Sequence, residues 1–448
     1  MSDQNNPTNK DPNSLSRRKF LKLGAGALAA GAASTLLPKT ASASSPMQVP
    51  YFSRQQKVNL RLLTWMKEEP GRGKAWQAML DKFNASQSDI SVELAGWQFN
   101  EYTNQILLQT KSGQIDGDLY MTTPDLVQRL KRENQLEPLQ DIIDKLGLTE
   151  KLSKAHDSIR DDDGRVLGLD IVTVGFGLMY NSKMFADAGV SEPTSVDEWV
   201  EISKTLTKRP DQFGIYSPHL PSEPEAMWFI LQQWAVLFDG IWANGKTPQV
   251  TSDAVINGLK LFKTMFDNAM PQGTDEPTAI RFGQTGRLAQ FLIVSAAVNV
   301  WKDEGPEVYP NLRSAMPFWP SKKAITRIHP LCVNPNGAQK EASKAFVEWL
   351  YTTDNYRELL ERQLDVIPAF PEGIRQEYLD SLFWSAGYQA AIPTTPPDIM
   401  GEFIFYNQEF GNIVTNQFQQ VLTGGLPVED AMATAQQELE ALGARVFA

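Results

Sequence analysis

The pattern of apolar and polar positions predicts an α/β fold in the first third of the chain. Residues 58–65 alternate between apolar and polar side chains, as a half-buried strand does. In the next segment Trp76, Met79, Leu80 and Phe83 recur at the spacing of one helix face. The predicted strands are 58–65, 90–94 and 118–121, the predicted helices are 74–84, 100–111 and 126–133, and 67–73 is predicted as a loop. Because strands and helices alternate with short connections, a parallel sheet covered by helices is favoured.

The same alternation returns after residue 185. Ser195 with Glu198 three residues later forms a capping box and predicts a helix start. The further predicted strands are 213–217, 295–301 and 328–333, and the further predicted helices are 226–238, 254–268, 287–291, 342–351, 355–362 and 430–442. The pattern therefore predicts a second α/β unit, about 14 helices and about 9 strands over the whole chain.

Residues 164–185 stand between these two units. Val166 to Leu178 is apolar and β-branched, interrupted by Asp170 and by several glycines. Glycine inside a strand marks a bend or a close approach of another group. We therefore expect 169–174 to link the two units and 175–179 to be the first strand of the second. Asp170 is interpreted as a polar residue at the floor of a cleft or at the edge of a hinge.

The first 43 residues have the features of an export signal. Ser16-Arg17-Arg18-Lys19-Phe20-Leu21-Lys22 resembles the twin-arginine motif, and residues 41–43 offer small side chains for cleavage. The apolar stretch between them is about 15 residues of mainly Ala and Gly, and a spanning helix needs about 20. No cysteine lies near the cleavage point, so a lipoprotein is not expected. A periplasmic location is predicted.

Charge and cysteine content exclude several classes of protein. The net charge is −11, and removal of residues 1–43, which carry six basic and two acidic side chains, makes it −15. A nucleic-acid partner is not expected at this charge. Cys332 is the only cysteine, so no disulfide within the chain can form.

Motifs for metal, phosphate or catalysis are weak. Residues 240–247 fit the P-loop pattern, but an amphipathic helix precedes them and Pro248 follows, so a surface loop is predicted. The three histidines are isolated, and 161–164 lack the calcium-loop pattern. No G-x-S-x-G elbow occurs. We expect no metal, no cofactor and no enzymatic activity, although counting carboxylates cannot exclude a glycosidase pair.

Aromatic and polar residues recur where predicted strands end. Trp65, Trp97 and Trp301 each close a strand, and residues 122–125 and 223–228 follow two others. In open α/β sheets ligands bind beyond the carboxyl ends of strands. A flat aromatic face suits the C–H face of a sugar ring, and carboxylates and amides suit its hydroxyls. Core packing is the competing interpretation for each single Trp, and it is preferred for Trp76, Trp199 and Trp349.

Several short motifs follow one another along the chain. They are Leu136-Glu137-Pro138-Leu139, Gly177-Leu178-Met179-Tyr180-Asn181, Pro193-Thr194-Ser195-Val196-Asp197-Glu198-Trp199, Val300-Trp301 and Leu422-Thr423-Gly424-Gly425. In this order and spacing they resemble the sugar-binding, maltose-binding-protein-like class of extracellular solute-binding proteins of ABC importers. The resemblance implies a periplasmic-binding-protein fold, in which two α/β lobes joined by a multi-strand hinge enclose a ligand cleft. It also implies capture of a sugar or polyol and delivery to ABC permease membrane subunits, by a monomer and without chemistry.

The resemblance also implies domain boundaries and ligand-binding residues. The first lobe is placed at 44–170 and 329–375, and the second at 171–328 and 376–448. The implied ligand-binding residues are Trp65, Lys67, Glu68, Trp97, Gln98, Tyr102, Thr123, Asp125, Thr173, Gly175, Glu223, Glu225, Trp228 and Trp301. The segment 164–185, which is expected to cross between the two units, lacks the acidic residue that some oligosaccharide-binding members carry before Tyr180-Asn181. Two alternatives stay open: the same fold binding a non-sugar solute such as a polyamine or glycerol phosphate, and an exported hydrolase.

Overall fold

The three N-terminal strands and their helices form the first part of the fold in the computed structural model, which describes residues 57–391, 394 and 398–448. The predicted export signal lies outside the described residues. Strands β1 (Val58–Leu63), β2 (Ile90–Ala95) and β3 (Leu119–Met121) run parallel, with β1 in the middle. The helices of this part are α1 (Pro70–Ser86), α2 (Phe99–Lys111), α3 (Pro124–Arg132), α4 (Gln140–Lys145), α11 (Lys340–Leu350) and α12 (Thr353–Gln363).

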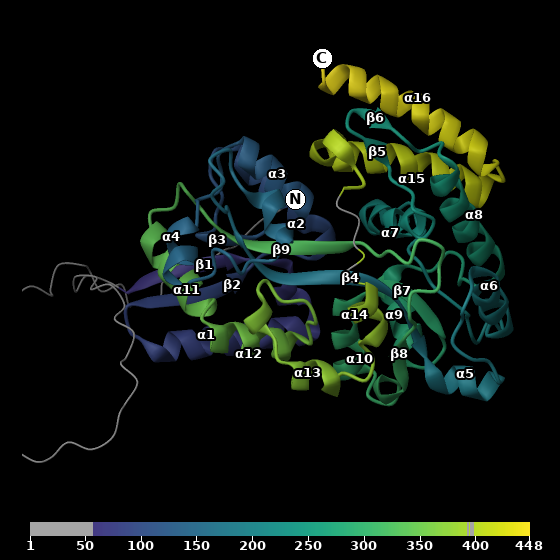
Figure 1. The fold of residues 1–448 in the computed structure, drawn as a ribbon, viewed down its shortest axis with the longest axis horizontal. Coiled ribbons are helices and arrows are strands. Elements are labelled where there is room, and N and C mark those ends of the chain that lie inside the picture. Colours follow the sequence, from purple (N-terminus) through teal and green to yellow (C-terminus); the bar gives the residue numbers. More distant parts are fainter. Residues whose placement is uncertain (1–56, 392–393, 395–397) are drawn as a thin grey trace, which may run out of the picture. The chain divides into compact units, whose positions relative to one another are not determined.

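Two long antiparallel strands continue this sheet into the second part of the fold. Strand β9 (Thr326–Val333) pairs with β3 and with the first half of β4 (Leu169–Asn181). The second half of β4 pairs with β7 (Gln290–Val294) and β8 (Leu312–Ser314). The resulting order is β2-β1-β3-β9-β4-β7, and Figure 1 shows β9 and β4 side by side. The parallel sheet predicted from the sequence is therefore parallel only in its first three strands.

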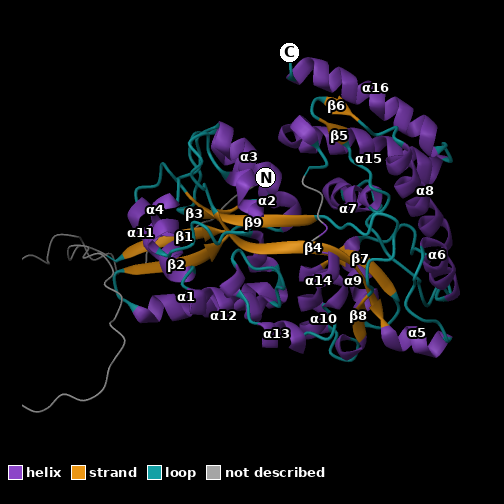
Figure 2. Ribbon diagram, viewed as in Figure 1, coloured by secondary structure: helices purple, strands orange, loops and turns teal. Residues whose placement is uncertain are grey.

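The second part of the fold is mainly helical around this end of the sheet (Figure 2). A short hairpin, β5 (Ala243–Asn244) and β6 (Thr247–Pro248), is the only other sheet among the described residues. The helices are α5 (Ser182–Ala188), α6 (Val196–Thr205), α7 (Pro224–Val236), α8 (Asp253–Asn268), α9 (Glu276–Gln284), α10 (Val298–Glu304), α13 (Gln376–Ser381), α14 (Ala386–Ala391), α15 (Asn407–Gly424) and α16 (Val428–Val446). The P-loop-like residues 240–247 contain β5 and the first residue of β6; residues 244–247 are exposed, whereas Trp242 and Ala243 are buried.

Buried apolar side chains form three large clusters. The first cluster contains residues from 60 to 174 and from 328 to 370, the second is built around α7, α8, α15 and α16, and the third gathers around β7, α10 and α14. The change from the first cluster to the others occurs inside β4, between Val174 and Phe176. The domain boundaries implied by the resemblance stay a prediction.

Four of the predicted elements are corrected by the structure. Residues 67–73 contain the start of α1, because Pro70 is at its first position, where a missing N–H costs nothing. Residues 287–291 run into strand β7, and 295–301 form a 3-10 turn and α10. Residues 213–217 form only two isolated bridges, one from Phe213 to Leu288 just before β7 and one from Tyr216 to Phe291 in β7. Short apolar runs fit a buried strand and a buried helix equally well, which explains the exchange at 287–301.

The glycines of the crossing segment allow close packing within the protein. A β-carbon on Gly168 would stand 2.7 Å from Cys332 Sγ, and one on Gly177 would stand 2.7 Å from the ring of Tyr388. Asp170 is fully buried rather than at a cleft floor, and it accepts hydrogen bonds from the His329 backbone N–H and the Thr173 hydroxyl. Burial raises its pKa to about 6. Residues Leu169–Asn181 form one continuous strand of 13 residues, β4, rather than a link followed by a strand.

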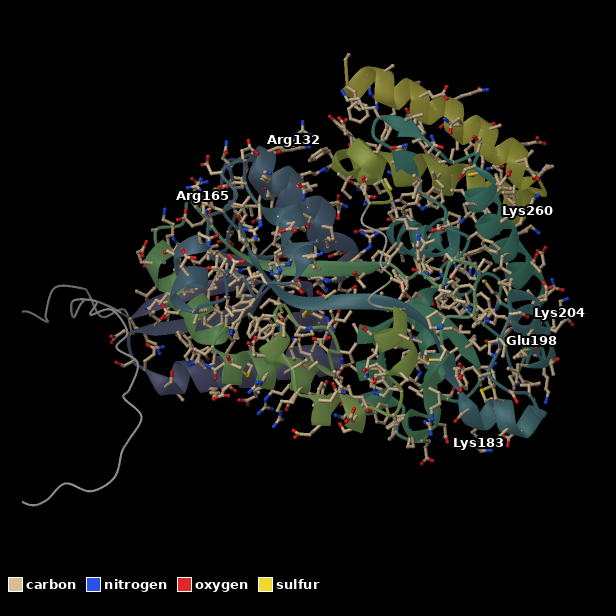
Figure 3. The ribbon with its side chains drawn as sticks, viewed as in Figure 1. Arg132, Arg165, Lys183, Glu198, Lys204 and Lys260 are labelled. Atoms are coloured by element: carbon tan, nitrogen blue, oxygen red, sulfur yellow. The ribbon has the colours of Figure 1, made fainter. Side chains whose placement is uncertain are left out.

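Charged side chains cover the outside of the described chain. The labelled residues in Figure 3, Arg132, Arg165, Lys183, Glu198, Lys204 and Lys260, are all exposed. Within residues 57–391, 394 and 398–448, no helix has the length and apolar character needed to cross a membrane.

Candidate ligand-binding site

A cavity of about 300 Å³ lies where the three core clusters meet. We call it the aromatic cavity, because six rings line it: Trp65, Phe99, Phe176, Tyr216, Phe229 and Phe291. Its volume is at the small end of the range for small-molecule sites. Trp65, at the start of a 3-10 helix after β1, packs edge-on against Phe99 and His329 with centroids 5.6 and 5.3 Å apart.

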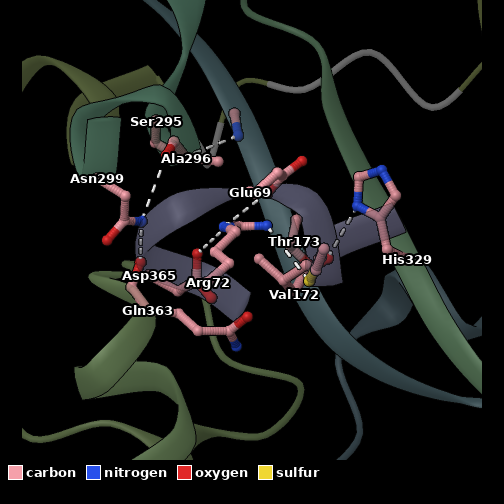
Figure 4. Close-up of polar contacts among 12 residues, drawn as sticks. Glu69, Arg72, Val172, Thr173, Ser295, Ala296, Asn299, His329, Gln363 and Asp365 are labelled. Carbon is pink, nitrogen blue, oxygen red and sulfur yellow. Dashed lines mark hydrogen bonds and ion pairs between the residues drawn. The ribbon is translucent and has the colours of Figure 1, made fainter. Parts of the chain in front are cut away.

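Four polar side chains of the cavity lining, those of Glu69, Arg72, Asn299 and His329, make polar contacts that Figure 4 shows. Glu69 lies just before α1, and Arg72 lies in its first turn. The Arg72 guanidinium donates to Asp365 Oδ1 at 2.5 Å and lies 3.7 Å from Glu69 Oε2. Asn299 of α10 donates its amide N–H groups to the carbonyls of Ala296 and Gln363.

His329 of β9 is the fourth of these side chains. Its Nδ1 lies 3.2 Å from the carbonyl of Val172. Burial, with Arg72 and Arg327 acting in the same direction, lowers its pKa to about 3. The imidazole is therefore neutral near neutral pH, with Nδ1–H donating to Val172 and Nε2 left as an acceptor.

Glu276, the first residue of α9, also lines the cavity. Its backbone N–H donates to the carboxylate of Glu223 at 3.2 Å. Burial raises the pKa of the Glu276 carboxyl to about 7, and the charge of Glu223 acts in the same direction. No side-chain hydrogen bond or ion pair of Glu276 is found within the described chain.

A second hollow, of about 180 Å³, lies on the neighbouring face of α7. We call it the outer groove. Burial, aided by Asp125, raises the pKa of Glu225 to about 7. Trp228 donates its indole N–H to Asn407 Oδ1 at 2.8 Å. Its lining is polar, with Thr103, Asn104, Asp125, Ser222, Glu223, Glu225, Asn407, Gln408 and Asn412 among its residues.

The structure separates the 14 predicted ligand-binding residues into three groups. Trp65 lines the aromatic cavity. Asp125, Glu223, Glu225 and Trp228 line the outer groove. The remaining nine line neither space, and they are Lys67, Glu68, Trp97, Gln98, Tyr102, Thr123, Thr173, Gly175 and Trp301.

Six of these nine are exposed or contact other parts of the protein. Lys67, Glu68 and Gln98 are exposed. Lys67 Nζ lies 3.8 Å from Glu68 Oε1. Tyr102 is fully buried and donates its hydroxyl to the carbonyl of Met121. The others in this group are Trp97, which packs against Tyr102, and Thr123, which caps α3 through Leu126 N–H.

The remaining three lie outside both linings because of strand geometry and burial. Val174 and Phe176 line the aromatic cavity, so Thr173 and Gly175 occupy the opposite face of β4, because successive strand residues point to opposite faces. Trp301 is 1% exposed and packs against Phe291 and Gly283. It belongs to a helix interior rather than to a strand end, and it cannot offer a ring face to a ligand in this conformation.

The residues that the sequence reasoning missed are often neighbours of those it named. Glu69 follows Glu68, Phe99 follows Gln98, and Phe229 follows Trp228. The Glu69-Pro70 pair was an available signal, because Pro at the first helical position places the preceding residue at the helix cap. Glu276, Asn299 and His329 reach the cavity only through tertiary packing. In the part of the chain that the structure describes, no group of three His, Cys, Asp or Glu could hold a metal ion.

Comparison with known proteins identifies the family. Residues 78–378 match the model of the bacterial extracellular solute-binding protein family. A putative binding protein of Brucella abortus is 22% identical over 297 residues, which are 62% of this chain and 69% of the relative. An ABC transporter solute-binding protein of Thermotoga lettingae, bound with α-D-tagatose, is 16% identical with a TM-score of 0.75, over 86% of this chain and 100% of that one. Maltose-bound T. maritima MalE3 is 18% identical with a TM-score of 0.74, over 86% and 100%. The two lobes that meet at the aromatic cavity are thus those of a periplasmic-binding-protein fold, and the chain belongs to the bacterial extracellular solute-binding protein family.

Proposed function

We propose that this chain is the solute-capturing subunit of an ABC importer, and that it holds a small sugar or polyol in the aromatic cavity. The supporting observation is the position of that cavity between the first cluster and the other two, with rings from both sides. Aromatic faces suit the C–H face of a sugar. The compared proteins of the same fold include one bound to tagatose and one bound to maltose.

Capture and release would follow from a hinge motion of the two lobes. Strands β4 and β9 pass between them, so small backbone changes near residues 174–176 and 326–328 would open the cavity. The liganded form would then be recognised by the permease subunits. The proposed role is binding and delivery without catalysis, by a monomer in the periplasm after export by the twin-arginine route.

Calorimetry with the mature protein, after removal of copurified solute by partial unfolding and dialysis, tests this function. The panel includes tagatose, maltose, mannitol, polyamines and glycerol phosphate. We expect a solute with micromolar affinity, which is about −8 kcal/mol. Trp65→Ala should weaken its binding by at least about tenfold, because a ring of the cavity is lost. Leu108→Ala, at an exposed position of α2, serves as the control.

Two results would contradict the proposal. One is the absence of binding by every class in the panel together with the absence of copurified solute. The other is a ligand whose affinity is the same for Trp65→Ala and for the wild type. Turnover of a glycoside by the purified protein, lost on replacing one carboxylate, would favour an exported hydrolase instead.

A further inference from the structure

Most of the polar groups that the aromatic cavity offers to a ligand are acceptors. Glu69 and Glu276 provide carboxyl oxygens; the Glu276 carboxyl, with a pKa of about 7, is partly protonated near neutral pH, and a cation beside it favours the ionised form. His329 provides the acceptor Nε2, because its Nδ1 is used by Val172. Asn299 provides Oδ1, for which no hydrogen bond is found within the described chain. A ligand must therefore supply donors to this cavity.

Most side-chain donors around the cavity have partners inside the protein; the exceptions are Arg72 Nε and Trp65 Nε1, for which no hydrogen bond is found within the described chain. Asn299 directs both amide N–H groups to the carbonyls of Ala296 and Gln363. Tyr216 donates its hydroxyl to the carbonyl of Thr274, at 3.5 Å. Arg72 has a 3% exposed side chain, and its guanidinium lies against Asp365, Glu69 and the sulfur of Met66. A neutral sugar, whose hydroxyl oxygens also need donors, would find few of them here.

The charges at the cavity are negative in sum. Arg72 is the one cation among the lining residues, and two carboxylates, Asp365 and Glu69, share it. Glu276 adds a carboxylate without a cation beside it. Arg327 lies over the ring of Phe229, 4.8 Å from its centroid, and hydrogen-bonds Gln232 rather than a cavity carboxylate. Burial of such an uncompensated charge is costly until a cation joins it.

The aromatic walls supply the second requirement of a cation site. Six rings surround the same space as the carboxylates, and an ammonium group is attracted to ring faces within about 6 Å of a centroid. We infer that the solute taken by this cavity carries a protonated amine, bound by Glu69 and Glu276 and packed against the rings. The inference rests on the proposed function and specifies its ligand. A sugar that bears an amine meets both the ring faces and the acceptors.

Matched pairs of small molecules test this inference by calorimetry near neutral pH, on the mature protein freed of copurified solute. Glucosamine, glucose and N-acetylglucosamine differ only in the group at one ring carbon. Cyclohexylamine and cyclohexanol repeat the comparison without sugar hydroxyls. We expect the amine of at least one set to bind at least about tenfold more tightly than its neutral partners. Binding of glucosamine alone indicates an amino sugar, and binding of cyclohexylamine as well indicates that the amine and an apolar body suffice.

Carboxamide variants test the residues. Glu276→Gln and Glu69→Gln keep the side-chain shape, and each should weaken amine binding by at least about tenfold while changing the affinity of the neutral partner much less. Glu341→Gln is the matched control, because Glu341 lies in the first turn of α11, is exposed, and is absent from both cavities. Circular dichroism and thermal unfolding confirm that each variant is folded.

The outcomes separate the inference from the function on which it rests. Neutral partners that bind as tightly as the amines, or Gln variants that bind the amine as the wild type does, overturn the inference. If a neutral sugar binds while no amine does, the inference fails and the proposed function stands. If neither amines, sugars nor any other class in the panel bind, both fail.

Discussion

Gly71 of α1 packs directly against Asn299 of α10. A β-carbon on Gly71 would stand 3.1 Å from Asn299 Cβ and 3.2 Å from Oδ1, which is tighter than ordinary van der Waals contact. The first residue belongs to the lobe of the first cluster and the second to the other lobe, and both line the aromatic cavity. The lobes can therefore approach this closely only because position 71 has no side chain.

Gly71→Val should hold the lobes apart. The added branched side chain has no space against Asn299, so we expect ligand affinity to fall by at least about tenfold and small-angle scattering to show less compaction on ligand addition. The free energy of unfolding should change by less than about 1 kcal/mol, because the substitution lies in the first turn of a helix.

Gly424→Val, at the exposed end of α15, is the control for this variant. It introduces the same side chain where the nearest atom is 3.5 Å away and belongs to the flexible side chain of Gln420. Normal affinity and full compaction of Gly71→Val would show that the contact does not govern closure.

Removal of one partner of the Arg72–Asp365 pair should strongly destabilise the protein. Both side chains are almost completely buried, and Asp365→Asn leaves the guanidinium without its closest anion. We expect a loss of about 3–5 kcal/mol in the free energy of unfolding, measured by urea denaturation. Replacing both, as Arg72→Met with Asp365→Leu, should cost less than the single change, because no unpaired charge remains buried. A double variant less stable than Asp365→Asn would argue against this account.

Stability without ligand should fall between about pH 6.5 and 8. The pKa of Glu276 and that of Glu225 are each raised to about 7, by burial and by Glu223 and Asp125 respectively. The folded protein therefore holds these protons more tightly than the unfolded chain, and their contribution to stability is lost as the pH rises through 7. The pKa values of His156 and His329 are lowered to about 4 and 3. Below about pH 6.5 the unfolded chain therefore binds protons at these histidines that the folded protein does not, and this opposes the effect of the two glutamates.

Thermal unfolding across this window checks the prediction. The variant Glu225→Gln/Glu276→Gln should show a flatter pH dependence than the wild type, since neither amide titrates. Equal slopes for the two proteins would assign the dependence to other groups.

Gly177→Ala should lower stability and leave ligand binding unchanged. The new methyl would stand 2.7 Å from the ring of Tyr388, which is buried and donates its hydroxyl to the carbonyl of Ile293. Overpacking of this kind costs about 1–3 kcal/mol. Tyr388 does not line the aromatic cavity, so calorimetry with the identified ligand should give the wild-type affinity. A weaker affinity with unchanged stability would instead place Gly177 at the site.

Local patterns were sufficient for much of the secondary structure. Trp76, Met79, Leu80 and Phe83 lie buried on one face of α1, and Ser195 caps α6 by accepting from Glu198 N–H, as the spacing predicted. These features depend on neighbours within one or two turns of the chain. The α/β class and the family followed from their order, and the family match and the compared structures confirm them.

The side of each element that faces the ligand was decided only by tertiary structure. The sequence named Glu68, Gln98 and Trp228, whereas the cavity is lined by Glu69, Phe99 and Phe229. A shift of one residue turns a helical side chain by about 100° and a strand side chain to the opposite face. The residue types near a strand end do not indicate which of two neighbours faces the cavity. Trp301 was misplaced for a related reason, because an apolar run does not reveal whether it is helix or strand.

The sequence by itself thus determined most of the helices and strands, the family, and the presence of aromatic and acidic residues near strand ends. Tertiary structure alone decided that Glu69, Glu276, Asn299 and His329 converge on one cavity with their acceptors free. These residues are separated by up to 260 positions along the chain, and no local periodicity relates them. Their convergence depends on the pairing of β4 with β9 and on the contact of Gly71 with Asn299, which are long-range interactions.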